Sequence, residues 1–150
     1  MRLLLDSSVL LGYLASADPG RTAVAELLRM TVDGRIDLLW TDALRNEVQR
    51  TAALRPSVRK RTNDAEVARP LSLVERYAVP VPPSVDPVPQ VCRDPGDDFV
   101  VAIAVAGRAD LVVTLDYDLL ALVEHGGVRF VKPGAALTAI RESGDGKGSH

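Results

Sequence analysis

Acidic side chains occupy the positions of this chain that could do chemistry. There are only two histidines, one of them the last residue, and a single cysteine. That cysteine, Cys92, excludes an internal disulfide and a cysteine-based zinc site, and we expect it to be a buried apolar residue. Aspartates flank an apolar run over 99–106: Asp94, Asp97 and Asp98 before it, Asp116 and Asp118 after it. We therefore predict that carboxylates carry out any reaction.

Closely spaced carboxylates need a counter-charge. Several of them within a few ångströms repel one another, and at pH 7 some would hold a proton unless a cation is present. Mg²⁺ and Mn²⁺ prefer oxygen ligands. A pair of such ions about 3.5–4 Å apart can hold the attacking and leaving oxygens of a phosphoryl displacement. Because the chain offers no histidine or cysteine nucleophile, these residues favour hydrolysis by metal-activated water.

Four short apolar runs predict strands at residues 3–6, 36–40, 111–114 and 128–131. Capping residues and helical spacing predict helices after Ser7 or Ser8, over 21–32, from Thr41 or Asp42 onward, and over 63–77, 118–123 and 133–140. Residues 99–106 are apolar on every side and fit a buried helix or a buried strand. The flanking aspartates and Gly107 favour the helix. This alternation predicts an α/β fold with a parallel sheet.

Four acids converge when they are placed on these elements. Asp6 closes the first strand, Asp116 follows the strand that ends at Thr114, and Asp98 opens the helix between them. Glu47 lies on a helix that leaves the end of another strand. The carboxyl ends of parallel strands meet at one edge of a sheet, where ligands bind in such folds. We therefore expect these four carboxylates to share one site.

The bulk properties limit the class of protein. A chain of 150 residues with 47% hydrophobic content fits one globular domain, which we place at residues 1–142, followed by a disordered polar tail at 143–150. No apolar run is long enough for a membrane span, and we expect a cytoplasmic protein. The proline-rich stretch 79–89 predicts an extended connection. The net charge of −2 means that a nucleic acid would have to bind a local basic patch.

Several stretches together resemble the PIN-domain family: LLLDSSVLLGYL at the start, the Asp42–Glu47 spacing, CRDPGDDFVVAIAVAGRADLVVTLDYDLLAL, and VKPGAAL near the end. The resemblance extends to about Ile140 and is closest to the bacterial toxin components of toxin–antitoxin pairs. It implies a three-layer α/β/α sandwich and a metal-dependent endoribonuclease. It also implies a small antitoxin partner that blocks the site, and a homodimer.

The resemblance assigns roles to individual residues. The four family acids fall on Asp6, Glu47, Asp98 and Asp116, with Asp6, Asp98 and Asp116 as metal ligands; Ser7, Thr114 and Asp118 match accessory positions. The chain departs from the family at Ser8, where an Asn is usual. We choose Asp98 over Asp97 as the ligand because its spacing to Thr114 and Asp116 fits the family pattern. Asp97 then either holds a metal ligand in place without touching the metal, or caps the helix.

The basic segment between residues 45 and 61 has two interpretations. It can be an ordinary solvated face, or it can bind the phosphates of RNA. Under the second hypothesis the contacts come from Arg55, Arg59, Lys60 and Arg61.

Two other classes of protein also fit parts of the sequence. One is a nuclease-inactive PIN-like module that binds RNA or a partner protein without cutting. The other is a phosphoacceptor receiver domain or a haloacid-type phosphatase, which also place Asp at strand ends. Asp6-Ser7-Ser8 lacks the second acid that the phosphatase needs, and Asp6 lacks the adjacent acid that a receiver domain needs.

Overall fold

A six-stranded sheet lies at the centre of the computed structural model, which describes residues 1–82, 88 and 90–148. The strands are β1 (Arg2–Leu5), β2 (Asp37–Trp40), β3 (Val79–Pro80), β4 (Leu111–Val113), β5 (Glu124–His125) and β6 (Val128–Val131). Their order across the sheet is β3-β2-β1-β4-β6-β5. All pairs are parallel except β5–β6, which is antiparallel. The expected parallel sheet is confirmed, with one antiparallel edge strand added.

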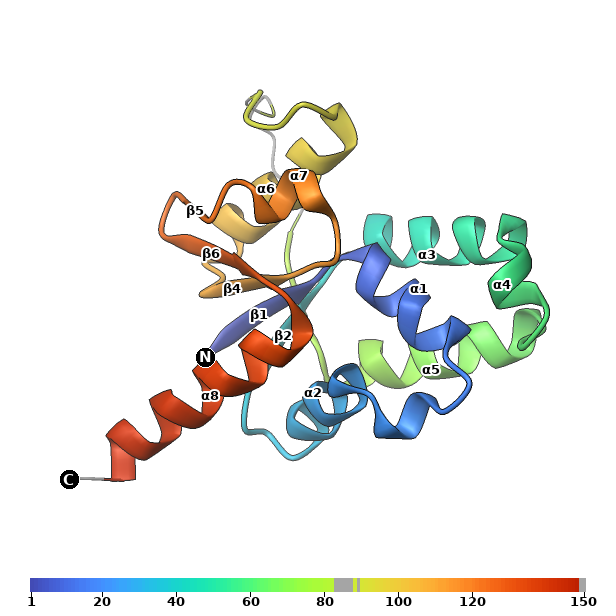
Figure 1. Cartoon of the computed structure of the whole chain (residues 1–150), viewed down its shortest axis with the longest axis horizontal. Helices are drawn as coiled ribbons and strands as arrows, with labels where there is room; N and C mark the ends of the chain where they lie inside the picture. The colour runs from blue at the N-terminus through green and yellow to red at the C-terminus, as the bar shows by residue number, and fades with distance from the viewer. Residues whose placement is uncertain (83–87, 89, 149–150) are drawn as a thin grey trace.

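Helices connect these strands: α1 (Ser7–Ala15), α2 (Ala23–Val32), α3 (Asp42–Leu54), α4 (Pro56–Arg59), α5 (Asp64–Tyr77), α6 (Pro95–Ala106), α7 (Tyr117–Leu120) and α8 (Pro133–Gly148), with a 3₁₀ turn at Pro19–Arg21. The apolar run 99–106 is therefore helical. In Figure 1, α6 and α7 lie on one side of the sheet, and α1, α2 and α8 lie on the other. This is the sandwich expected when right-handed crossovers run in both directions from β1.

Helices α3, α4 and α5 extend beyond the edge of this sandwich (Figure 1). Helix α3 packs against α1 and α5, which connects this helical lobe to the rest of the molecule. Each longer helix of the lobe has a side-chain cap: Thr41 accepts from the Leu44 amide at the start of α3, and Asn63 and Glu66 form a reciprocal capping box at the start of α5. The helix α5 continues through Pro70.

Some elements differ from the sequence prediction. Strands β3 and β5 have two residues each, so pairing with neighbouring strands defines them more than local sequence pattern does. Helix α4 has only four residues. Helix α8 continues to Gly148, so residues 143–148 are helical where a disordered tail was expected. The three glycines in this stretch have low intrinsic helix propensity, which is why the sequence predicted a tail there. Residues 83–87 of the expected extended connection lie outside the described residues.

The buried leucines of the sheet hold the site edge in place. Leu3, Leu4 and Leu5 of β1 are at most 1% exposed, and the strand is paired on both sides. Gly107, at the end of α6, lets that helix approach the sheet closely. A Cβ there would come within 2.8 Å of the Leu39 side chain and 3.0 Å of the Val81 side chain. The glycine is therefore needed for packing, and its backbone remains in the right-handed region.

Candidate metal centre

Asp6 joins the ends of two neighbouring strands. It follows β1, caps α1 and is only 5% exposed. Its Oδ1 accepts from the Ser7 amide at 2.8 Å, and its Oδ2 accepts from the hydroxyls of Ser8 at 2.8 Å and Thr114 at 2.9 Å. A carboxylate has about four lone-pair positions, so these three bonds leave one, on Oδ1. Asp6 can therefore still bind a cation.

The two hydroxyls extend this network to the loop after β4. Ser8 Oγ accepts from the Leu115 amide at 3.2 Å, and Thr114 Oγ accepts from the Asp116 amide at 3.0 Å. Ser8 thus bonds both to Asp6 and to the β4 loop. A single serine hydroxyl makes the two connections at the position where the family usually has the longer Asn.

Three further carboxylates form a compact group. One oxygen from each of Asp97, Asp116 and Asp118 lies within 4.8 Å of the other two. Asp116 caps the short helix α7, and its Oδ1 accepts from the Asp118 amide at 2.8 Å. Asp97 comes from the first turn of α6. The group therefore brings together one acid from α6 and two from the segment after β4, at the start of α7.

Within the part of the chain that the structure describes, Asp97 is the member of this group that has a buried and unpaired carboxylate oxygen. Its Oδ2 is buried and has no hydrogen-bond partner among the described residues. Burial, with the negative charges of Asp116, Asp94 and Asp6, raises the pKa of Asp97 to about 7. A divalent cation would remove both the repulsion and the unmet acceptor, and an all-carboxylate set is what Mg²⁺ or Mn²⁺ prefers. These residues therefore fit such an ion.

Asp98, the adjacent residue, is held quite differently. It is 5% exposed, and its Oδ1 accepts from the backbone amides of Cys92 at 2.6 Å and Val91 at 2.9 Å. These amides hold the pKa of Asp98 below its ordinary value. Asp98 thus fixes the segment before α6 and lies outside the three-carboxylate group, so the geometry favours Asp97 over the expected Asp98 as the ligand.

Cys92 matches its expected role. It is 7% exposed and free. Burial raises the pKa of its thiol to about 11, and the charge of Asp98 adds to this effect. A thiol of that pKa is uncharged at neutral pH and is a poor nucleophile.

Glu47 also lies outside the carboxylate group. It is partly buried on the second turn of α3 and makes no hydrogen bond or ion pair within the described part of the chain. Arg45, its possible ion-pair partner, instead contacts Glu75 at 2.8 Å and Asp42 at 3.8 Å. The structure therefore brings Asp6, Ser7, Ser8, Thr114, Asp116, Asp118 and Asp97 to one edge, and leaves Glu47 and Asp98 separate from the group.

Periodicity could not have decided between Asp97 and Asp98. In α6, Val101 and Ala104 are the most buried residues, at 1% and 0% exposed, and Asp98 precedes Val101 by three residues, which places it on the inner face. Because the run is apolar on every side, this inner face is not visible in the sequence. The role of Asp94, whose side chain caps α6 and whose charge reaches Asp97, was also missed.

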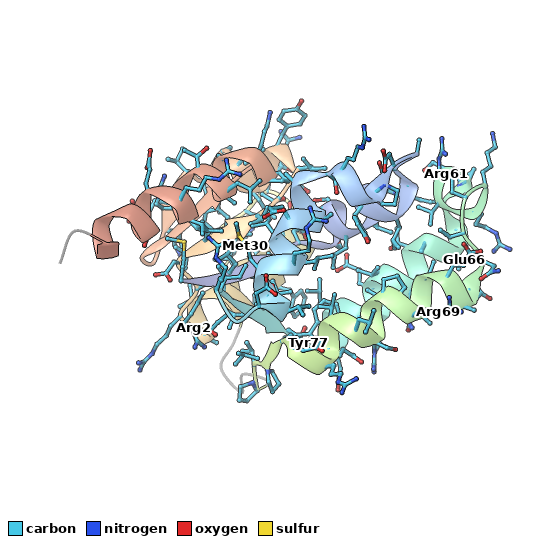
Figure 2. The ribbon with its side chains drawn as sticks, turned by 90° about the horizontal axis from the view of Figure 1, so that it is seen from below. Arg2, Met30, Arg61, Glu66, Arg69 and Tyr77 are labelled. Carbon is cyan, nitrogen blue, oxygen red and sulfur yellow. The ribbon has the colours of Figure 1, made fainter. Side chains whose placement is uncertain are left out.

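The later part of the basic segment, residues 55–61, lies away from the carboxylates, in and around α4 of the helical lobe. Figure 1 shows α4 at the far end of this lobe from α6 and α7, and Figure 2 shows Arg61 at the same end. Helix α3 separates the two regions with its 13 residues, or about 20 Å. A cavity of about 700 Å³ opens between α3, α4 and α5, and Arg50 and Arg59 line it together with Asn46, Gln49 and Asn63.

Comparisons with known proteins agree with this geometry. A protein-family model described as PIN domain matches residues 2–118, which include Asp6, the group of Asp97, Asp116 and Asp118, and the basic segment. No curated protein and no solved structure gave a significant match to the chain. In the described residues, no helix is both long and apolar enough to cross a membrane.

Proposed function

Because the chain belongs to the PIN-domain family, whose fold is that of a nuclease, we propose that it is a divalent-metal-dependent endoribonuclease. The observation that supports this proposal best is the group of Asp97, Asp116 and Asp118, with a buried Asp97 oxygen that has no donor in the part of the chain that the structure describes. Such a group is costly in the folded chain unless it binds something positive.

In this proposal, Asp97, Asp116 and Asp118 hold the cation, and Asp6 adds its remaining Oδ1 position beside them. When bound, Mg²⁺ or Mn²⁺ would supply a water nucleophile at neutral pH and stabilise the charge that develops on the phosphate. Ser8 and Thr114 hold Asp6 and the β4 loop at a fixed separation. Glu47 lies outside the three-carboxylate group, as Asp6 does; unlike Asp6, it is not among the charges that raise the pKa of Asp97, and we assign it no ligand role.

A metal titration combined with a cleavage assay tests the proposal. We expect Mn²⁺ to bind by calorimetry and a labelled single-stranded RNA to be cut only with Mg²⁺ or Mn²⁺ present. Asp6→Asn should abolish cleavage while circular dichroism shows an intact fold. Retained cleavage in Asp6→Asn at saturating Mg²⁺, or cleavage in the presence of a chelator, contradicts the assignment.

The main rival is a nuclease-inactive PIN-like module that binds RNA or a protein. The absence of Glu47 from the group formed by Asp97, Asp116 and Asp118 is the observation in its favour. It predicts that Mn²⁺ fails to bind tightly and that RNA is bound without being cut. The same titration therefore decides between the two functions.

For the RNA itself, we propose that Arg55, Arg59, Lys60 and Arg61 contact the phosphate backbone. The chain is acidic overall, so an RNA needs a local positive surface beyond the carboxylates. The cavity beside α4 has two arginines, several amide side chains and one acid, Asp64, on its walls, which leaves it with a net positive charge. An RNA that reaches both this surface and the metal centre has to run along α3.

Charge reversal tests this path. Lys60 and Arg61 are exposed and make no side-chain hydrogen bond or ion pair among the described residues. Changing both to Glu should weaken RNA binding and lower the slope of log K against log salt concentration by about 1.4, or about 0.7 for each phosphate contact. The matched control is Arg141→Glu, an exposed change on α8. An unchanged slope in the double variant refutes the path.

The partners that the family resemblance implies complete the proposal. We propose that the chain is the toxin of a toxin–antitoxin pair, that a small antitoxin blocks the carboxylate edge, and that the chain forms a homodimer. Expression of the wild type, but not of Asp97→Asn, should then arrest cell growth. Light scattering of the purified protein tests the dimer, and a monomer would contradict that part.

A further inference from the structure

One exposed aromatic side chain stands directly at the candidate metal centre. Tyr117 is 81% exposed, the highest value among the large hydrophobic residues of the described chain. It lies between Asp116 and Asp118, two members of the carboxylate group. Aromatic residues make up only 4% of the sequence; Trp40 and Phe130 are in the core at 4% exposure each, whereas Phe99 and Tyr77 are also exposed, at 61% and 44%. An exposed aromatic ring therefore lies next to the proposed reaction centre.

Among the described residues, no hydrogen bond or ion pair holds the side chain of this tyrosine. Helix α7 buries Leu119, two residues later, so Tyr117 lies on the opposite face of the helix. Its hydroxyl makes no hydrogen bond within the described residues. An isolated exposed aromatic is ordinary on a protein surface. What distinguishes Tyr117 is its position.

The backbone around Tyr117 is fixed by the same bonds that place Asp116. The Leu115 amide donates to Ser8, the Asp116 amide donates to Thr114, and the Asp118 amide donates to the Asp116 carboxylate. Asp116 is extended, at φ −78° and ψ 124°, and Tyr117 directly follows it as the first residue of α7. These hydrogen bonds therefore fix the position of the Tyr117 backbone relative to the carboxylates.

We propose that Tyr117 is a positioning residue on which a base beside the scissile phosphate stacks. The inference rests on the proposed ribonuclease function. A phosphate held at the carboxylates places its own nucleotides within reach of the next side chain, and an aromatic ring accepts the face of any base. The stacked base fixes the register of the RNA over Asp97, Asp116 and Asp118. Because a base in a duplex is already stacked on both faces, the contact requires an unpaired nucleotide.

Steady-state kinetics of a substitution series tests the role. Tyr117→Ala should lower kcat/KM on a single-stranded RNA by about 5- to 150-fold, mainly through KM, the range for loss of one base–aromatic stack. Tyr117→Phe and Tyr117→Trp should stay close to wild type, because they keep a ring. Mn²⁺ affinity by calorimetry should be unchanged throughout. The matched control is Tyr77→Ala on α5, another exposed tyrosine, labelled in Figure 2, which should have no effect.

A second readout works without cleavage. Among single-stranded RNAs that carry 2-aminopurine at successive positions, at least one should lose fluorescence on binding to the wild type in Ca²⁺, and lose less on binding to Tyr117→Ala. If the wild type binds RNA but does not cut it, the proposed function fails while this readout still tests the stack. The inference is overturned if Tyr117→Phe loses as much as Tyr117→Ala, if Tyr117→Ala matches wild type in both assays, or if no RNA is bound.

Discussion

Two adjacent aspartates in the first turn of α6 have opposite electrostatic surroundings. On one side, Asp98 accepts hydrogen bonds from two backbone amides, and its pKa is lowered. On the other side, Asp97 faces Asp116 and Asp118, has a buried oxygen without a donor, and has a pKa of about 7. The residues are neighbours in sequence but point about 100° apart around the helix.

This difference shows how to distinguish a structural carboxylate from a candidate ligand. A carboxylate that the protein supplies with N–H donors has its charge balanced inside the fold, and it contributes stability. A carboxylate packed against other carboxylates is balanced only from outside, by a proton or a cation. The charge alone, which the sequence gives, does not separate the two. The donors around it do.

The largest expected effect comes from neutralising the unbalanced acid. Asp97→Asn removes a proposed ligand, so RNA cleavage should fall by at least about 100-fold and Mn²⁺ binding should weaken, because metal stabilisation of the reaction is worth several kcal/mol. The metal-free variant should melt no lower than wild type, since the substitution also removes repulsion from Asp116. Calorimetry, cleavage rates and thermal melts measure the three quantities.

Asp98→Asn is the matched change on the other side of the turn, and its effects should be reversed. The amides of Val91 and Cys92 would bond to a neutral oxygen in place of a charged one, which weakens both bonds. We expect a melting temperature several degrees lower at pH 7, with Mn²⁺ binding and cleavage close to wild type. The difference in stability should shrink in acid, because a lowered carboxyl pKa stabilises the fold only while the group is ionised. A greater loss of Mn²⁺ binding in Asp98→Asn than in Asp97→Asn would reverse the comparison.

Much of this architecture could be predicted from the sequence. Leu3–Leu5 and the run 111–113 are short and apolar between breaking residues, so their strand character is local, and parallel strands place Asp6 beside Asp116. The choice between Asp97 and Asp98 could not be predicted, since it depends on where the Val91–Cys92 backbone packs. The same holds for β3 and β5, whose two residues are strands only because β2 and β6 lie beside them.

A pH series sharpens the contrast from the proton side. With its pKa at about 7, Asp97 is largely protonated at pH 6, and a cation has to displace that proton. Mn²⁺ binding should therefore release about one proton at pH 6 and almost none at pH 8, and affinity should fall up to about tenfold per pH unit below 7. Calorimetry in two buffers of different ionisation enthalpy counts these protons. Equal release at both pH values would contradict the raised pKa.

The same raised pKa has a consequence for the metal-free fold. Folded Asp97 holds its proton more tightly than in the unfolded chain, whose value is near 3.8. This contribution to stability is complete below about pH 4 and is lost as the pH rises through 7. Wild type should therefore lose stability relative to Asp97→Asn between pH 4 and 7, with metal removed by a chelator. Parallel melting curves over this range would contradict the expectation.

The smallest effect is expected at Ser8, which connects Asp6 to the loop that holds Asp116. Ser8→Ala removes a donor to Asp6, at a cost of about 1 kcal/mol for this partly buried bond, and an acceptor for the Leu115 amide, whose exposed bond contributes less. We expect cleavage to fall by about fivefold, with a melting temperature a few degrees lower. Ser7→Ala is the matched control, because only the backbone of Ser7 is bonded to Asp6 and its hydroxyl has no partner among the described residues. Ser8→Asn, which restores the residue usual in the family, should retain more activity than Ser8→Ala, and equal loss in Ser7→Ala and Ser8→Ala would mean that the Ser8 bridge does not position the site.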